Sequence, residues 1–227
     1  MKESGNNIGP VSYNVKLLFI VDAIIFFLWP VGSLISSFKH RNYFWAKNIF
    51  WLFCIFFGAT FITTEGFDSA ATHNALIDFR KTGIELKDLL PLLYSEKSTY
   101  VDIVQPLLLY IISKFTDNQS VLFAIYGLIF GYFYSRNLWF VLDKIQGKIP
   151  TPIFIFILTF ALICPIWLIN GFRMWAATHI FIFGLLPYLI DGKKNRLWWS
   201  FLSIFFHFSF VFPVLILIGY ILLKNKV

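Results

Sequence analysis

Residues 63–106 read TTEGFDSAATHNALIDFRKTGIELKDLLPLLYSEKSTYVDIVQP, and they interrupt a chain that is otherwise strongly apolar. The stretch holds seven acidic and four basic side chains, a formal charge of −3, whereas the whole 227-residue chain carries +7. The rest of the chain therefore carries +10. An acidic segment of mixed polarity inside a basic, apolar chain is where we expect the chemistry of this protein.

The composition predicts an integral membrane protein. Hydrophobic residues make up 58% of the chain and charged residues 14%, with a mean hydropathy of +0.72, whereas soluble domains are about a quarter charged. A spanning helix needs roughly 20 mostly apolar residues. We therefore expect an all-α polytopic membrane protein with about six transmembrane helices in a single domain, residues 1–227. The candidate spans are about 16–38, 47–62, 120–140, 151–169, 172–190 and 198–222.

Two kinds of residue inside these spans need separate interpretation. Pro30 and Pro213 are expected to kink their helices without ending them, because neighbouring helices can satisfy the freed backbone groups. Cys54 and Cys164 lie in apolar runs and are interpreted as packing residues.

The positive-inside rule orients the predicted spans. Lys and Arg cluster near residues 39–47, 136–148 and 193–196, so placing these clusters in the cytoplasm puts 63–106 outside. This topology requires that 103–115, too short to span, forms a re-entrant or interfacial helix. A seven-span alternative would place 193–196 outside. The basic residues flank apolar segments, so no nucleic-acid partner is expected.

Glu65 and Asp68 are the candidate catalytic residues. They follow the second predicted span directly, and a carboxylate held at the membrane surface can act as a general base on a hydroxyl group. The same carboxylates could hold a divalent cation with neighbouring oxygens. Alternatively, Asp68 caps the helix that begins near Ser69. The later charges of the stretch, from Asp78 to Asp102, are interpreted as solvated surface.

Four further polar residues are candidates for substrate binding. His73 follows Asp68 by little more than one helical turn, so the two could share a face, although a surface histidine is the simpler interpretation. Asn170 and Arg173 stand where two apolar runs meet, and a guanidinium group there suits phosphate; the alternative is an arginine that extends to the membrane interface. His207 lies in a span among aromatic residues, and His179 is interpreted as a packing residue.

Familiar motifs for nucleotide and metal chemistry are absent. The sequence holds no P-loop, Rossmann fingerprint, GxSxG or kinase set, and no HExxH. These absences argue against ATP-driven transport and against soluble-type nucleotide-sugar chemistry, and no cofactor is predicted with certainty.

Three segments together resemble the EpsG family of bacterial exopolysaccharide-assembly proteins, which are Wzy-like polymerases. They are EGFDSAATHNALIDF, YVDIVQPLLLYIISKF, and NGFRMWAATHIFIFG followed by FFHFSFVFPVLI. The first half is also similar to the GT-C class of glycosyltransferases, which act on polyprenyl-linked sugars and have a Pro-containing return similar to Gln105–Tyr110. The resemblance covers residues 48–215. The family often has an Arg before its Gly-x-Asp motif, where this chain has Thr63 and Thr64.

The resemblance implies a GT-C-like fold and an activity. Asp68 would be the essential acid, Arg173 would contact the lipid phosphate, and His207 and Gln105 would line the site. The implied function is glycosyl transfer or polymerisation of polyprenyl-(pyro)phosphate-linked sugars at the outer face of the bacterial cytoplasmic membrane, alongside other polysaccharide-assembly proteins. The alternatives are a non-catalytic assembly subunit or lipid-linked-sugar flippase, and a membrane acyltransferase with His73 or His207 as base.

Overall fold

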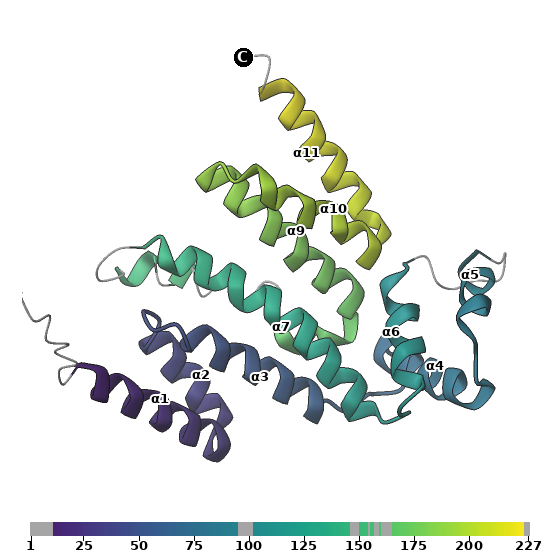
Figure 1. The fold of residues 1–227 in the computed structure, drawn as a ribbon, viewed down its shortest axis with the longest axis horizontal. Helices are drawn as coiled ribbons and strands as arrows, with labels where there is room; N and C mark the ends of the chain where they lie inside the picture. Colours follow the sequence, from purple (N-terminus) through teal and green to yellow (C-terminus); the bar gives the residue numbers. More distant parts are fainter. Residues whose placement is uncertain are drawn as a thin grey trace, which may run out of the picture.

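The computed structural model describes residues 11–94, 102–145, 150–153, 155–156, 159 and 165–224. Every regular element in these ranges is helical, which confirms the predicted all-α class (Figure 1). The elements in chain order are α1 (Val11–Leu28), α2 (Pro30–Lys39), α3 (Ala46–Thr60), α4 (Asp68–Thr82), α5 (Leu86–Tyr94), α6 (Val104–Ser113), α7 (Gln119–Asp143), η1 (Ile166–Gly171), α9 (Phe172–Asp191), η2 (Lys194–Arg196), α10 (Leu197–Phe206), η3 (Phe208–Phe210) and α11 (Val211–Lys224).

The centre of the fold is the close pair α3 and α7. Gly58 and Gly127 allow their backbones to touch. A Cβ at Gly58 would lie 2.0 Å from the carbonyl oxygen of Phe123, and one at Gly127 would lie 2.4 Å from that of Cys54. Small residues permit such a close approach between helix backbones. Cys54 is fully buried in the same seam, as expected of a packing residue.

Helix α9 packs on the other side of α7 and carries α10 on its outer surface. The ring of Phe172 stacks on Tyr126 with centroids 3.8 Å apart. Gly184 brings α10 close, because a Cβ there would lie 2.4 Å from the hydroxyl oxygen of Ser200. Helices α3, α7 and α9 therefore form the packed centre of the fold, which we call the frame, and the polar segments connect to it.

The predicted span 16–38 is wrong as a single helix. Helix α1 ends at Leu28, and α2 begins at Pro30, a residue suited to the first helical position because it has no backbone N–H. The chain reverses there, since Asp22 accepts a hydrogen bond from Ser36 at 2.6 Å. Fourteen residues of continuous helix would separate the two by roughly 21 Å. Pro30 starts a new helix and does not merely kink one.

The predicted span 198–222 is also interrupted. Helix α10 ends at Phe206, and His207 is extended with φ −153° and ψ 118°. Helix α11 then starts at Val211, so Pro213 falls in its first turn and produces no kink in a longer helix. The break lies at the histidine, six residues before the proline at which a bend is predicted.

The remaining predicted spans have different outcomes. Residues 47–62, 120–140 and 172–190 match α3, α7 and α9, whereas 151–169 falls largely outside the described residues, as does Cys164. Within the described ranges, one helical run is long and apolar enough to cross a membrane, namely Ile166–Asp191, with 26 residues and a hydropathy of 1.4. Shorter apolar helices are Ala46–Thr60, Val104–Ser113 and Phe208–Lys224.

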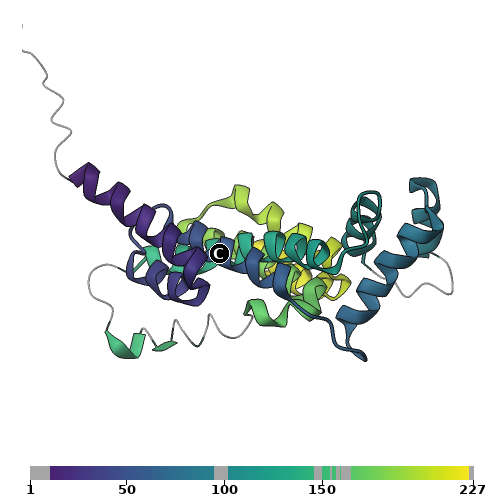
Figure 2. The same cartoon turned by 90° about the horizontal axis from the view of Figure 1, so that it is seen from below.

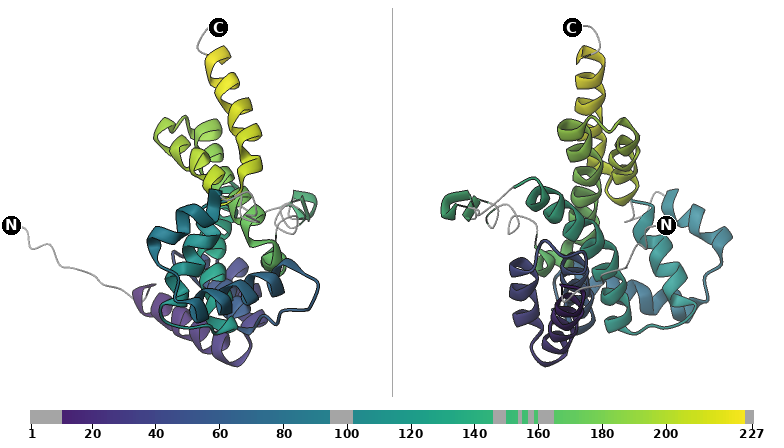
Figure 3. Two further views of the ribbon diagram at one scale, coloured as in Figure 1. Left: turned by 90° about the vertical axis from the view of Figure 1, so that its right-hand side faces the viewer. Right: turned by 60° about the vertical axis from the view of Figure 1, so that its left-hand side comes forward.

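Helices α4, α5 and α6 come from the acidic stretch and gather beside one end of the α3–α7 pair (Figures 2 and 3). Helix α6 matches the helix predicted at 103–115, and α4 matches the one predicted after Asp68. Arg80 joins them by donating to the carbonyl oxygens of Ser113 and Lys114 at 2.9 and 2.8 Å. A cation at a helix C-terminus is favourable because it meets carbonyl groups that lack partners in the helix.

Candidate functional site

A cavity of about 160 Å³ lies where α4, α6, α7, α9 and the His207 turn meet. It is lined by Asp68, Thr72, Gln105, Tyr126, Asn170, Gly171, Phe172, Arg173, Met174, Trp175 and His207. A second pocket of about 170 Å³ shares four of these residues, namely Asp68, Thr72, Gln105 and Arg173, and adds Ala71, Ala75 and Leu109. We call the two together the Asp68 cavity.

Five of the seven candidate residues from the sequence meet in this cavity. They are Asp68, Gln105, Asn170, Arg173 and His207. They belong to four segments that lie far apart in the sequence, so their meeting depends on the fold. Glu65 and His73 do not line it.

Asp68 enters the cavity from the first turn of α4, but it is not the N-cap. Phe67 holds the cap position, with extended backbone at φ −105° and ψ 157°, and no side chain bonds the first turn there. Asp68 is the first helical residue of α4 and does not occupy the cap position before the helix, so the predicted capping role is wrong. Its carboxylate is exposed and accepts no hydrogen bond from the described residues.

Two amide side chains fix the surroundings of Asp68. Gln105 donates to the Thr72 hydroxyl at 2.9 Å, and Thr72 donates to the carbonyl oxygen of Asp68 at 2.7 Å. Gln119 accepts from the Thr63 hydroxyl at 3.0 Å and donates to the carbonyl of Phe61 at 2.8 Å. The loop before α4 is thus tied to the start of α7. Gln119 is a supporting residue that sequence reasoning missed.

Arg173 is held by a buried carboxylate that sequence reasoning also missed. Its Nη1 lies 3.2 Å from Oδ2 of Asp102, whose side chain is only 3% exposed. The other oxygen of Asp102 accepts from the backbone N–H of Phe208 at 2.7 Å. The interpretation of Asp102 as solvated surface is therefore wrong. The available signal was its position directly before the apolar run that begins at Ile103.

The ion pair leaves Arg173 able to bind a ligand. An arginine has five N–H donors, and among the described residues Asp102 is its one hydrogen-bond partner. The side chain remains 31% exposed and lines both parts of the cavity. A guanidinium group fixed at one corner can present its remaining donors to carboxylate or phosphate oxygens in a preset direction.

His207 stands at the break after α10, and Asn170 lies near the end of η1, where η1 continues into α9. Ser209 places its hydroxyl oxygen 2.7 Å from Nδ1 of His207 and donates its backbone N–H to the same nitrogen at 3.3 Å. Because Nδ1 accepts from a backbone donor, the neutral ring carries its proton on Nε2. Asn170 accepts from the N–H of Gly171 at 3.0 Å. The helix break at His207, which the sequence did not reveal, brings the imidazole to the cavity.

His73 and Glu65 lie elsewhere. The Nε2 atom of His73 lies 3.2 Å from the carbonyl oxygen of Asp117. Five residues of helix correspond to a rotation of about 140°, so His73 and Asp68 do not share a face, contrary to the expectation. Glu65 is exposed beside Gly66, which turns the chain with φ +87°.

His179 is enclosed by aromatic rings. Its ring lies 4.9 Å from Phe130 and 4.8 Å from Tyr134 between centroids, and its carbonyl accepts from Asn137 at 2.7 Å. These contacts agree with a packing role. In the part of the chain that the structure describes, no group of three or more His, Cys, Asp or Glu side chains could hold a metal ion.

No protein-family model matches the sequence, and searches among curated proteins and solved structures found no match.

Proposed function

We propose that the chain is a polytopic protein of the bacterial cytoplasmic membrane that transfers or polymerises polyprenyl-(pyro)phosphate-linked sugars at its external face. The family resemblance supplies the substrate class. The meeting of Asp68, Gln105, Asn170, Arg173 and His207 in one cavity carries the proposal, because these residues come from four segments far apart in the sequence and only the fold brings the segments together.

The outer surface supports a lipid environment. Large apolar side chains are exposed along α1 and α11, among them Ile24, Phe27, Phe212, Leu215 and Ile216. A soluble monomer seldom exposes continuous apolar surface of this kind. In a bilayer these side chains would face acyl chains, and the shorter apolar helices would complete the spans together with their neighbours.

The proposed reaction assigns a role to each charged group. Asp68 accepts the proton of an acceptor hydroxyl as that oxygen bonds to the anomeric carbon of the donor sugar. The bond from that carbon to the lipid phosphate breaks, and the phosphate leaves with the electron pair. Arg173 stabilises the charge that develops on it. Gln105 and Asn170 offer amide groups to sugar hydroxyls, and the ring of Trp175 offers an apolar face.

The test compares two carboxylates three residues apart. Asp68→Asn keeps the shape of the side chain and removes its basicity, so glycan product should fall by about 10²–10⁴-fold, the usual contribution of general base catalysis. Glu65→Gln, outside the cavity, should retain activity within about twofold. Product is measured in purified membranes supplied with lipid-linked sugar, at matched protein levels. Full activity of Asp68→Asn would rule out the catalytic role.

A non-catalytic assembly subunit or flippase remains the alternative. A flippase needs a polar path across the membrane and would depend most on His179 and His207. The burial of His179 between Phe130 and Tyr134 argues against such a path. Transport of a fluorescent lipid-linked sugar by reconstituted Asp68→Asn, without product formation in the wild type, would favour the flippase.

A further inference from the structure

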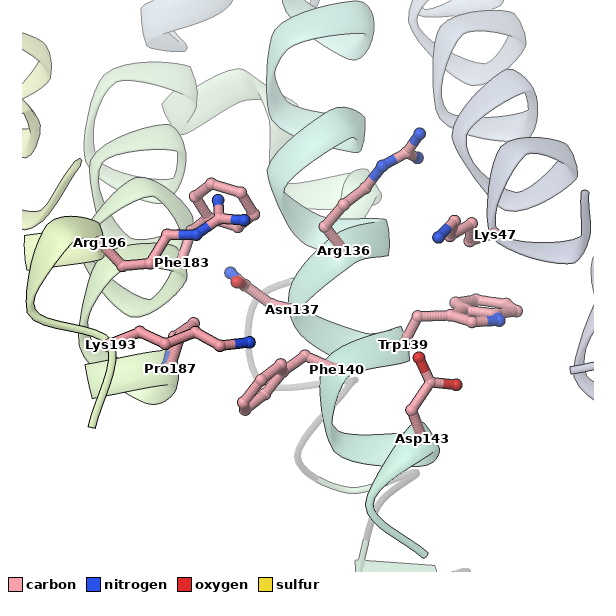
Figure 4. A pocket seen from close by; sticks show the side chains of 10 residues that line it. All are labelled: Lys47, Arg136, Asn137, Trp139, Phe140, Asp143, Phe183, Pro187, Lys193 and Arg196. Carbon is pink, nitrogen blue, oxygen red and sulfur yellow. The ribbon is translucent and has the colours of Figure 1, made fainter. Parts of the chain in front are cut away.

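Another pocket, of about 170 Å³, shares no lining residue with the Asp68 cavity and lies toward the other end of α7 (Figure 4). It is lined by side chains from α3, α7, α9 and η2, namely Lys47, Arg136, Asn137, Trp139, Phe140, Asp143, Phe183, Pro187, Lys193 and Arg196. We call it the basic pocket. Four of its lining residues are cations and one is an anion, so its formal charge is +3.

The two arginines of the basic pocket are oriented by neutral partners. Arg136 donates to the side chain of Asn48 at 2.7 Å and to the hydroxyl of Ser135 at 2.8 Å. Its guanidinium carbon also lies 4.6 Å from the ring centroid of Tyr132, and that of Arg196 lies 5.2 Å from Phe183. These contacts fix the direction of each group without neutralising its charge.

Ion pairing does not remove the excess positive charge. Of the four cations, Lys193 alone forms an ion pair with a carboxylate of the described residues, 3.4 Å from Asp191, and Asp191 also binds Lys144. Figure 4 shows Arg136 and Lys47 extending into the space between α7 and α3, and Lys193 and Arg196 on the other side of α7, next to α9. Cations collected in one place repel one another unless an anion lies between them.

The backbone is built to keep η2 close to this pocket. A Cβ at Gly184 would lie 2.8 Å from the carbonyl oxygen of Arg196, so the glycine permits direct contact between α9 and η2. Ser200 also donates to the carbonyl of Phe181 at 2.9 Å. The position of Arg196 therefore follows from main-chain packing, and its guanidinium group does not depend on a flexible loop.

We propose that the basic pocket binds a phosphate group, either the headgroup of an anionic membrane lipid or a soluble phosphate compound. Guanidinium groups match phosphate oxygens with two parallel donors, and basic pockets between helices near a membrane surface commonly hold anionic headgroups. This site is distinct from the Asp68 cavity, and the proposal does not depend on glycosyl transfer.

The experiment uses full-length protein in nanodiscs and three charge-removing variants. Arg136→Gln and Arg196→Gln remove lining groups, and Lys194→Gln removes an exposed cation of η2 that does not line the pocket. One arm titrates inorganic pyrophosphate by calorimetry. The other measures enrichment of phosphatidylglycerol over phosphatidylcholine around the protein by native mass spectrometry.

Each arginine variant should weaken binding by about tenfold or more, because a charge-assisted hydrogen bond is lost, and Lys194→Gln by less than about twofold. Pyrophosphate binding that the two arginine variants weaken, without lipid enrichment, assigns a soluble phosphate ligand to the basic pocket, and selective lipid enrichment that they weaken, without pyrophosphate binding, assigns a headgroup. Equal losses in all three variants would reduce the effect to general surface charge and overturn the proposal, as would no binding in either arm.

Arg136 is partly buried, so Arg136→Gln could fail to fold. Arg196→Gln carries the test in that case, since η2 lies at the surface. Asp68→Asn should bind pyrophosphate and lipid like the wild type. Loss of binding in that variant would show that the two sites are one, and loss of glycan product alone leaves this proposal standing.

Discussion

The Asp68 cavity and the basic pocket are both lined by residues of α7 and α9, yet they hold opposite uncompensated charge. In the cavity, Arg173 is paired with the buried Asp102, and the exposed Asp68 has no counter-ion among the residues that the structure describes. In the pocket, Arg136 and Arg196 are held by neutral groups. The identity of the partner, more than the number of charges, decides what each site can bind.

The distance between the two sites follows from helix geometry. Tyr126 lines one and Asn137 the other, and eleven residues of α7 span roughly 16 Å. The space between them is filled by Phe130, Tyr134 and His179, which are all buried. The sites are therefore separate, and changes to one should leave the other intact unless the shared frame is damaged.

Disrupting the packing of α3, α7 and α9 should have the largest effect on stability and on both sites. Gly127→Ala disrupts this packing most directly. The added Cβ would meet the backbone of Cys54, which cannot move aside as a side chain could. We expect a loss of about 3 kcal/mol from such overpacking, with both sites lost together. Gly219→Ala is the matched control, because nothing lies within 4 Å of a Cβ there. Thermal unfolding in detergent measures the difference, and equal stability of the two variants would contradict the close α3–α7 contact.

Asp102→Asn should have the next largest effect, and it should separate the two sites. The change removes the negative partner of Arg173 and weakens the acceptor for the N–H of Phe208. We expect about 1–2 kcal/mol of destabilisation, discounted because Arg173 is partly exposed, and a marked loss of glycan product. Binding of pyrophosphate in the basic pocket should not change. Asp78→Asn, on exposed α4 surface, is the control, and a silent Asp102→Asn would mean that the ion pair does not position Arg173.

The sequence identified individual residues of the Asp68 cavity more successfully than it predicted where the helices begin and end. Asp68, Arg173 and His207 could be selected because polar groups beside apolar runs are costly without a role. Hydropathy also located α3, α7 and α9. Their meeting at one cavity could not be derived, since it depends on packing between segments about 100 residues apart.

The errors have a common physical origin. Hydropathy measures how apolar a segment is and does not register where its backbone turns. The runs around Trp29 and His207 are apolar enough on average to be predicted as single spans, yet a helix ends at both positions. The burial of Asp102 was missed for a related reason, because its counter-ion lies 71 residues away in the sequence.

Gln119→Ala tests how firmly the loop before α4 must be held, and its effect should be smaller. The variant loses two hydrogen bonds, to Thr63 and to the carbonyl of Phe61. Each contributes about 1 kcal/mol or less at a partly exposed position. We expect about 1 kcal/mol of destabilisation and a modest fall in glycan product, with the basic pocket unaffected. Asn118→Ala is a poor control because Asn118 caps α7, so Asn74→Ala on exposed α4 surface is used. No change in either stability or product would show that the loop is ordered by other contacts.

His73→Gln should have the smallest effect of all, and this expectation makes it a test of the acyltransferase alternative. The imidazole contacts one backbone carbonyl and lies outside the Asp68 cavity, on a different face of α4 from Asp68. A surface substitution of this kind changes stability by about 0.5 kcal/mol or less, and glycan product should stay within about twofold of the wild type. An acyltransferase that used His73 as its base would instead lose nearly all activity with this change. For glycosyl transfer, Asp68→Asn should lose activity and His73→Gln should retain it, whereas an acyltransferase that uses His73 as its base should show the reverse. Product assays on the two variants in one membrane preparation therefore decide between these two chemistries.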